Sequence, residues 1–186
     1  MKKNKNENLE YRIDNRSIKQ FKKDILCRTL KEKFLLELFI QECIYLGNTI
    51  QVEDYGIDNT GKFVEKATTK PDYKICIDGK VGLYEIKSSK SSNICTFKVH
   101  NLKKYVEYNA NILLFYGTGD VENDVGNLDE ENIRWAILTP SIIKKMLKNK
   151  KSYIEKMFGN KMCIQLRCEE FDDYFDSYYL SFLEKG

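Results

Sequence analysis

The chain has 186 residues, of which 42% are hydrophobic and 32% are charged, so we expect one domain with an ordinary core and a heavily charged surface. It contains no apolar run of the roughly 18 residues that span a bilayer, and we expect no secretory signal. Its six cysteines are scattered, which favours a reducing, cytoplasmic location. With a single histidine the chain offers no paired zinc ligands. The net charge of +3 is unevenly distributed, with seven lysines and one acid in 144–161 but six acids and no base in 118–131, which suits either a polyanion-binding face or an ordinary solvated surface.

The N-terminal part of the chain predicts one long helical region. Residues 1–16 are polar and are expected to form a flexible segment that precedes a single domain over 17–186. Apolar spacing predicts a helix over 17–46, with a capping-box pattern at Thr29–Glu32 that could restart it. Gly47 is typical of the residue that follows a helix C-terminus.

The middle of the chain predicts strands. Residues 48–55 read as a first strand, followed by turn chemistry. The strongest hairpin signal comes next, because Tyr73–Ile77 and Val81–Lys87 read as strands on either side of Asp78-Gly79, a pair that favours a tight turn.

The next elements complete a recognisable order. A helix is predicted over 97–108 and a buried strand over 111–116. The order helix, strand, strand, strand, helix, strand indicates an α/β (α+β) core, with a central mixed sheet flanked by helices. C-terminal additions are predicted as a strand over 133–138, a helix opened by Thr139-Pro140, a short helix over 152–158, a strand over 162–166 and an aromatic segment with helical spacing over 171–182.

Three residues of the predicted hairpin could carry chemistry. Asp72 follows Pro71 at the start of the first strand, while Glu85 and Lys87 are two apart on the second and so project from one face. Hairpin pairing can bring Asp72 to the same end. Two carboxylates with one lysine suit Mg²⁺ bound to a phosphate group, with the lysine beside the attacking water. The alternative is a turn acid next to a solvated Glu–Lys pair.

At these residues the chain resembles the PD-(D/E)xK nuclease superfamily, which has the restriction-endonuclease-like fold. The matching stretch is Pro71-Asp72, a gap of twelve residues, and Glu85-Ile86-Lys87. The resemblance covers about residues 30–116 and implies an α-β-β-β-α-β core. It implies Asp72, Glu85 and the main-chain carbonyl of Ile86 as ligands of Mg²⁺, for which Mn²⁺ can substitute, and Lys87 as the residue that positions the water.

The same resemblance implies further site residues. Members of the family often add a glutamate from the first core helix, which points to Glu37, ten residues before Gly47, with Glu42 as the second choice. Many members also carry a glutamine four residues before a tyrosine in the next helix, whereas here Asn101 precedes Tyr105, a departure from that pattern. If the resemblance holds, salt-dependent contacts to nucleic acid fall to Lys90, Lys98, Asn101, Lys103 and Lys104.

The expected function is a Mg²⁺-dependent endonuclease that hydrolyses DNA phosphodiester bonds and leaves 5′-phosphate ends, in restriction, homing or phage DNA processing. Cutting both strands of a duplex at once calls for two sites, which a homodimer sharing the two-fold axis of the duplex would supply. Two alternatives stay open at this point. One is an RNA endonuclease of the same fold, and the other is a catalytically silent module for nucleic-acid binding or assembly.

Overall fold

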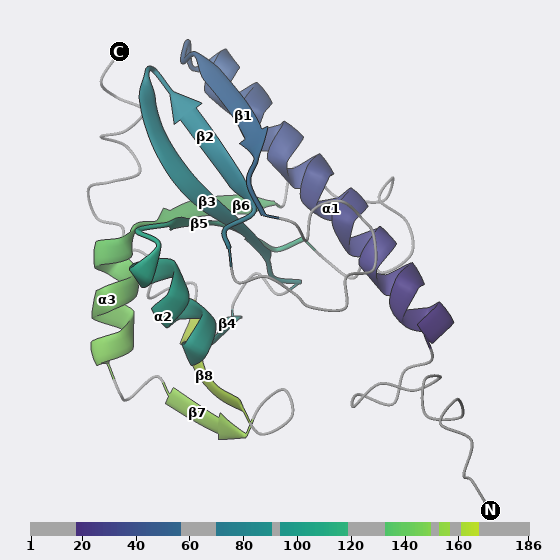
Figure 1. Ribbon diagram of the computed structural model, residues 1–186, viewed down its shortest axis with the longest axis vertical. Coiled ribbons are helices and arrows are strands. Elements are labelled where there is room, and N and C mark those ends of the chain that lie inside the picture. The colour runs from purple at the N-terminus through teal and green to yellow at the C-terminus, as the bar shows by residue number, and fades with distance from the viewer. Residues whose placement is uncertain are drawn as a thin grey trace, which may run out of the picture.

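The structure is a computed structural model that describes residues 18–56, 70–90, 94–118, 133–149, 153–156 and 161–167. Within these ranges the chain forms three helices and two sheets, which confirms the predicted mixed α/β class (Figure 1). The elements in chain order are α1 (Ile18–Tyr45), β1 (Ile50–Asp54), β2 (Tyr73–Ile77), β3 (Lys80–Ser88), β4 (Ile94–Lys98), α2 (Val99–Glu107), β5 (Asn111–Tyr116), β6 (Arg134–Leu138), α3 (Pro140–Lys148), β7 (Tyr153–Lys156) and β8 (Lys161–Arg167).

The first helix, α1, is continuous, so the restart predicted at Thr29–Glu32 is not used. Leu35, Phe39 and Cys43 recur at intervals of four residues and are buried, which places them on the face that packs against the sheet. The helix ends as predicted, because Gly47 has a positive φ of 82° and its N–H donates to the carbonyl of Ile44.

The central sheet has the strand order β1-β2-β3-β5-β6. Its neighbouring strands are antiparallel except for β3 and β5, which run parallel, so the sheet is mixed. The β2–β3 hairpin turns at Asp78 and Gly79, both with positive φ, as the sequence predicts. The carboxylate of Asp78 accepts hydrogen bonds from the backbone N–H of Thr49 at 2.8 Å and from its hydroxyl at 3.0 Å, which ties the turn to the loop before β1.

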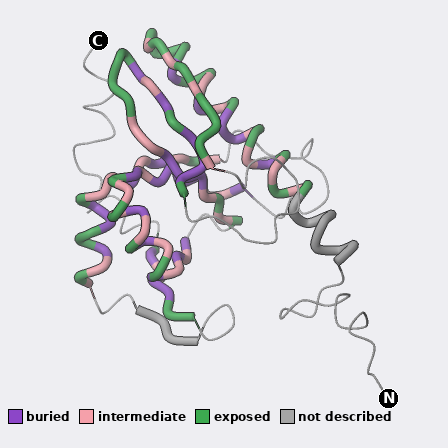
Figure 2. The backbone as a smooth tube through the Cα atoms, in the orientation of Figure 1, coloured by how far each residue is buried: buried purple, intermediate pink, exposed green. Residues whose placement is uncertain are grey.

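Each face of the central sheet buries its own hydrophobic core. Leu113 and Phe115 of β5 pack with α1, whereas Ile112 and Leu114 of the same strand pack with α2, α3 and the second sheet. The second sheet has the order β4-β8-β7. Figure 2 shows the buried stretches gathered around β5, in the middle of the molecule. The sheet therefore separates α1 from the other two helices.

Two segments differ from the sequence predictions. Residues 94–98 form β4, so α2 begins at Val99 and not at 97. Residues 153–156 form the strand β7 and not part of a helix, because they pair with β8, and such pairing overrides weak local preferences. The predictions for 1–16, 119–132 and 171–182 lie outside the described residues. None of the helices that the structure describes is long and apolar enough to cross a membrane.

The turn of the hairpin yields a prediction about stability. Replacing Asp78 by alanine removes both hydrogen bonds to Thr49 and leaves a β-carbon at positive φ, so the free energy of unfolding should fall by about 1–2 kcal/mol. Asp78→Asn keeps an acceptor oxygen and tolerates this backbone conformation, so it should retain most of the stability. Urea denaturation measures both values, and equal losses would contradict a role for the side-chain oxygen.

Candidate active site

Asp72 and Glu85 meet at the open end of the β2–β3 hairpin. Tyr73 pairs with Tyr84 across the hairpin, so one further step of the register places Asp72 opposite Glu85. The backbone N–H of Ile86 donates to Asp72 Oδ2 at 2.8 Å and holds that side chain across to β3. Both carboxylates are buried, with 8% and 7% exposure.

The main chain at Asp72 is held by the end of β1. The backbone N–H groups of Tyr55 and Gly56 donate to the Asp72 carbonyl at 2.9 and 3.1 Å. A β-carbon at Gly56 would lie 2.8 Å from the carbonyl oxygen of Pro71, closer than such atoms approach in proteins. This glycine therefore permits the close approach that fixes the start of β2.

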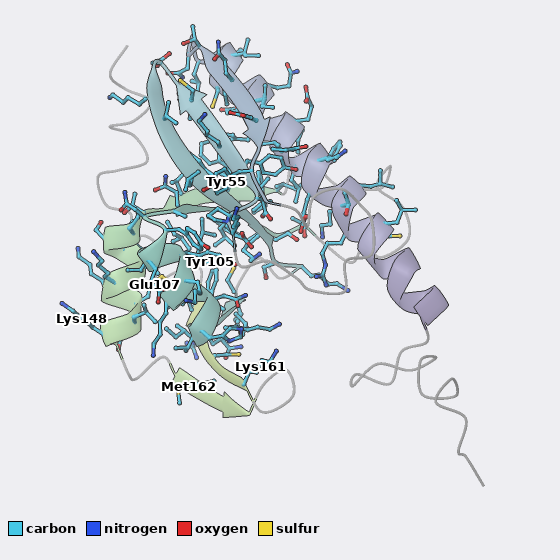
Figure 3. All side chains as sticks on the ribbon, in the orientation of Figure 1. Tyr55, Tyr105, Glu107, Lys148, Lys161 and Met162 are labelled. Carbon is cyan, nitrogen blue, oxygen red and sulfur yellow. The ribbon has the colours of Figure 1, made fainter. Side chains whose placement is uncertain are left out.

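Lys87 and Tyr105 both reach Glu85. Lys87 Nζ donates to Glu85 Oε1 and, at 3.3 Å, to the carbonyl of Ile86. The hydroxyl of Tyr105, in α2 (Figure 3), donates to the same Oε1 at 2.7 Å. Lys87 Nζ lies 5.9 Å from the centre of the Tyr105 ring. Within the described part of the chain no donor reaches the second oxygen, Oε2, of this buried carboxylate.

The close carboxylates perturb the pKa values of the whole cluster. Burial, and then the charge of Glu85, raises the pKa of Asp72 from 3.8 to about 8, although Lys87 and the N–H of Ile86 act in the opposite direction. Burial acts to lower the pKa of Lys87, but the effects of Glu85, Tyr105 and Asp72 are together larger, so the pKa of Lys87 is raised. Burial also raises the pKa of Tyr105, which keeps this side chain a donor. Lys87 is therefore the counter-charge of the carboxylate pair.

A third carboxylate, Glu32 of α1, lies near enough to the pair for its charge to act on Asp72. Burial raises the pKa of Glu32, and the charges that act on it are Lys87 and Arg28, which lower that pKa, and Glu85, which raises it. Glu32 lies four residues before the buried Leu36, on the side of α1 that packs against the sheet. An acid within the apolar stripe of a helix is the sequence signal that could have identified it.

Glu37, the helix carboxylate that the resemblance implied, lies elsewhere. It is exposed, and its Oε1 accepts a hydrogen bond from the Gln41 amide at 2.9 Å. Five residues along a helix correspond to a rotation of roughly 140°, which turns Glu37 away from the side that carries Glu32. Glu42, the second choice, is exposed as well. Of the three glutamates, Glu32 is the one near the cluster. The face of α1 that is buried decides which glutamate lies there, and the distance from the end of the helix does not.

Hydrogen bonds next to this cluster tie α1 to the ends of β3 and β5. The buried Lys31 donates from Nζ to Thr118 Oγ1 at 2.8 Å, and Thr118 Oγ1 donates to the Ser89 carbonyl at 3.1 Å. The N–H of Ser89 donates in turn to the carbonyl of Phe115 at 2.8 Å. Because Glu32 follows Lys31 directly, this chain of bonds fixes the position of the third carboxylate.

The residues predicted to contact nucleic acid differ in their surroundings. Lys98 is half-buried at the start of α2, where burial and the nearby charges of Lys161 and Arg28 lower its pKa. Lys104 forms an ion pair with Glu107 at 2.6 Å, which partly neutralises its charge. The others are exposed or half-buried, namely Lys90, Asn101 and Lys103.

The oxygen atoms of this centre fit a hard divalent cation. Mg²⁺ takes one or two carboxylates from a protein and completes its shell with water and phosphate oxygens. Asp72, Glu85 and the carbonyl of Ile86 supply ligands of this kind, and Glu85 Oε2 has no competing donor among the described residues. The described ranges contain no group of three or more His, Cys, Asp or Glu side chains that could hold a metal ion. The protein would thus contribute two carboxylates and one carbonyl.

Comparison with protein-family models, with curated proteins and with solved structures finds no match for this chain.

The raised pKa of Asp72 predicts how stability depends on pH in metal-free buffer. Its pKa in the fold, about 8, lies above the ordinary 3.8. Between these two pH values the carboxyl is ionised in the unfolded chain and protonated in the folded one, so the free energy of unfolding falls progressively as the pH rises. Asp72→Asn removes the charge and keeps an acceptor for the N–H of Ile86. It should raise the free energy of unfolding by roughly 1–2 kcal/mol at pH 8 and by much less near pH 4. Chemical denaturation at several pH values measures this difference, and a difference independent of pH would contradict the assignment.

Proposed function

We propose that this protein is an endonuclease of the PD-(D/E)xK type that hydrolyses DNA phosphodiester bonds with Mg²⁺ or Mn²⁺. The observation that carries the proposal is the meeting of Asp72, Glu85 and Lys87 at the end of a hairpin, with Glu32 of α1 nearby. The element order supports it, because α1, β1, β2, β3, α2 and β5 follow the α-β-β-β-α-β order, with β4 as an insertion.

Asp72, Glu85 and the carbonyl of Ile86 would hold the cation. When bound, the cation polarises the phosphodiester and lowers the pKa of a water molecule. The N–H of Ile86 orients Asp72 and the hydroxyl of Tyr105 orients Glu85, so both carboxylates are positioned before any ligand arrives. Such orientation by neighbouring groups is what gives a metal site its geometry.

Lys87 and Glu32 are the groups that would act on the attacking water. The raised pKa of Lys87 keeps its ammonium charged, so it can donate to the water and to the phosphate oxygens as negative charge builds on them. Glu32 lies within electrostatic reach of Lys87 and, with its raised pKa, can accept the proton of the water. The water oxygen then bonds to phosphorus and the bond to the 3′ oxygen breaks, and the released 3′ oxygen takes a proton from solvent, which leaves a 5′-phosphate and a 3′-hydroxyl.

Two alternatives compete with this proposal, namely an RNA endonuclease of the same fold and a silent module for nucleic-acid binding or assembly. The buried carboxylate pair favours an enzyme over a silent module. A structural element gains no stability from burying one carboxyl group beside another, whereas perturbed carboxyl pKa values are typical of functional sites. For cleavage of both strands, a homodimer would bring one centre to each strand.

Cleavage assays with matched variants test the proposal. Supercoiled plasmid and single-stranded RNA are incubated with the protein in Mg²⁺ or Mn²⁺. We expect the wild-type protein to cut the plasmid, and we expect Asp72→Ala, Lys87→Ala and Glu32→Gln each to lose activity by on the order of 10²–10⁴-fold. Glu37→Gln removes the same charge from the opposite side of α1 and should retain the wild-type rate.

Other outcomes of these assays would point elsewhere. Cleavage of RNA alone would favour the RNA endonuclease, and binding without cleavage in either metal would favour the silent module. If Glu37→Gln were inactive while Glu32→Gln cut normally, the assignment of the helix carboxylate would be reversed.

The role of Tyr105 can be measured separately. Tyr105→Phe removes the hydrogen bond to Glu85 and leaves the ring in the core, so the fold should persist. The Mg²⁺ concentration for half-maximal cleavage should rise by about 10–100-fold, because a group that orients a metal ligand contributes affinity of this size. An unchanged Mg²⁺ requirement with a lower maximal rate would argue against this positioning role.

A further inference from the structure

Tyr55, which directly follows β1 (Figure 3), continues the row of residues that contains the two buried carboxylates. Strand β1 pairs with β2 as far as Asp54 and Tyr73, so one further step of the register places Tyr55 beside Asp72. The 2.9 Å hydrogen bond from the N–H of Tyr55 to the carbonyl of Asp72 shows that the pairing continues over this step. Since Asp72 lies opposite Glu85, the three residues stand side by side on three neighbouring strands.

The side chain of Tyr55 belongs to the same face of the sheet as the carboxylates. Successive side chains of a strand point to opposite faces, so Tyr55 shares a face with Glu53, two residues earlier. For the same reason Asp72 shares a face with Lys74. Glu53 and Lys74 form an ion pair at 3.0 Å, so both belong to one face of the sheet. Paired side chains on one face have their β-carbons roughly 4.5–5.5 Å apart, which makes Tyr55 the direct neighbour of Asp72.

Lys70 brings an ammonium group to the ring of Tyr55. Its Nζ lies 5.7 Å from the centre of the ring, within the range of a cation–π interaction. Both side chains are accessible, because 40% of Tyr55 is exposed and Lys70 is exposed as well. An accessible aromatic ring with a cation beside it therefore borders the buried carboxylate pair.

A nucleotide carries both of the groups that such a pair recognises, namely a flat base and an anionic phosphate. Aromatic side chains stack on bases, and this stacking tolerates any base because every base has a π face. A lysine contacts phosphate oxygens irrespective of the base sequence. An anion without a ring would use Lys70 alone, and an apolar partner would use Tyr55 alone. The pair together thus fits a nucleotide better than either of these ligands.

We propose that Tyr55 and Lys70 form a subsite for the nucleotide next to the phosphodiester that is cut, with the ring of Tyr55 stacked on the base and the ammonium of Lys70 on the phosphate. This inference rests on the proposed function. A base stacks on a side chain only after it has left its neighbours in the duplex, so the subsite favours DNA with an unpaired nucleotide at this position. Neither residue belongs to the motif, and it is the pairing of β1 with β2 that brings them to Asp72.

Binding assays with two kinds of strand test the stacking. The parent protein carries Asp72→Asn, which should bind without cutting, and it is compared with versions that also carry Tyr55→Leu or Tyr55→Phe. One probe is a labelled single strand of DNA, and the other is a strand of the same length that keeps the sugar–phosphate backbone and lacks the bases. Fluorescence anisotropy without divalent metal gives each affinity. Tyr45→Leu is the matched control, because Tyr45 is 86% exposed at the end of α1.

We expect Tyr55→Leu to weaken binding of the strand with bases by about tenfold and to leave binding of the base-free strand unchanged. Tyr55→Phe keeps the ring and should bind like the parent, as should Tyr45→Leu. Equal losses on the two strands, or a loss in the Tyr45 control as large as that in Tyr55→Leu, would overturn the subsite.

Lys70→Gln tests the phosphate contact in the same assay at several salt concentrations. The salt dependence of binding should become smaller by about one phosphate contact on both strands. Lys80→Gln, an exposed position at the hairpin turn, should leave it unchanged. The same salt dependence in Lys70→Gln as in the parent would overturn the role of Lys70.

Cleavage by the wild-type protein decides the proposed function independently. A wild-type protein that cuts DNA, together with Tyr55→Leu and Lys70→Gln versions that bind like the parent, would refute the subsite alone. The expected binding losses in a protein that cuts neither DNA nor RNA would refute the proposed function and leave the nucleotide contact in place.

Discussion

Asp72 and Glu85 lie side by side at the open end of the β2–β3 hairpin, and most of the surrounding structure compensates for burying two carboxylates together. Burial, and then the charge of Glu85, raise the pKa of Asp72 far above its ordinary value, and the nearby charge of Lys87 only partly offsets them. The N–H of Ile86 and the hydroxyl of Tyr105 hold the two side chains in place despite their repulsion. Burying two carboxyl groups side by side lowers the stability of the fold, a compromise that is typical of functional sites.

The layered architecture explains how side chains from distant parts of the chain reach this pair. The central sheet keeps α1 and α2 on opposite faces, and the centre lies where β3 ends, so both helices can contribute there. Glu32 arrives from the α1 layer and Tyr105 from the α2 layer. The second sheet, which is not part of the α-β-β-β-α-β order, packs on the α2 side of the central sheet.

The parts of the site that are close in sequence could be predicted, and the parts that depend on packing could not. Asp78-Gly79 predicts the hairpin, and the hairpin register alone places Asp72 opposite Glu85. The resemblance points to Glu37 as the helix carboxylate, and the structure shows Glu37 exposed and bonded to Gln41, because the distance to the end of a helix says nothing about which face is buried. Leu36 is buried, and Glu32 lies four residues before it on the same face of α1, so the buried face of the helix would have pointed to Glu32. Strand β7 was missed for a similar reason, since its conformation depends on pairing with β8.

The layering also limits the order in which the chain can fold while it is being synthesised. Helix α1 leaves the ribosome first, but the buried side formed by Leu35 and Phe39 packs with Leu113 and Phe115 of β5, which are made much later. The hydrogen bond from Lys31 to Thr118 likewise forms only after β5 has been made. A nascent chain shorter than this carries an uncovered apolar stripe on its first helix, which is the kind of surface that chaperones bind. The apolar stripe of α1 is therefore covered only after β5 has been made.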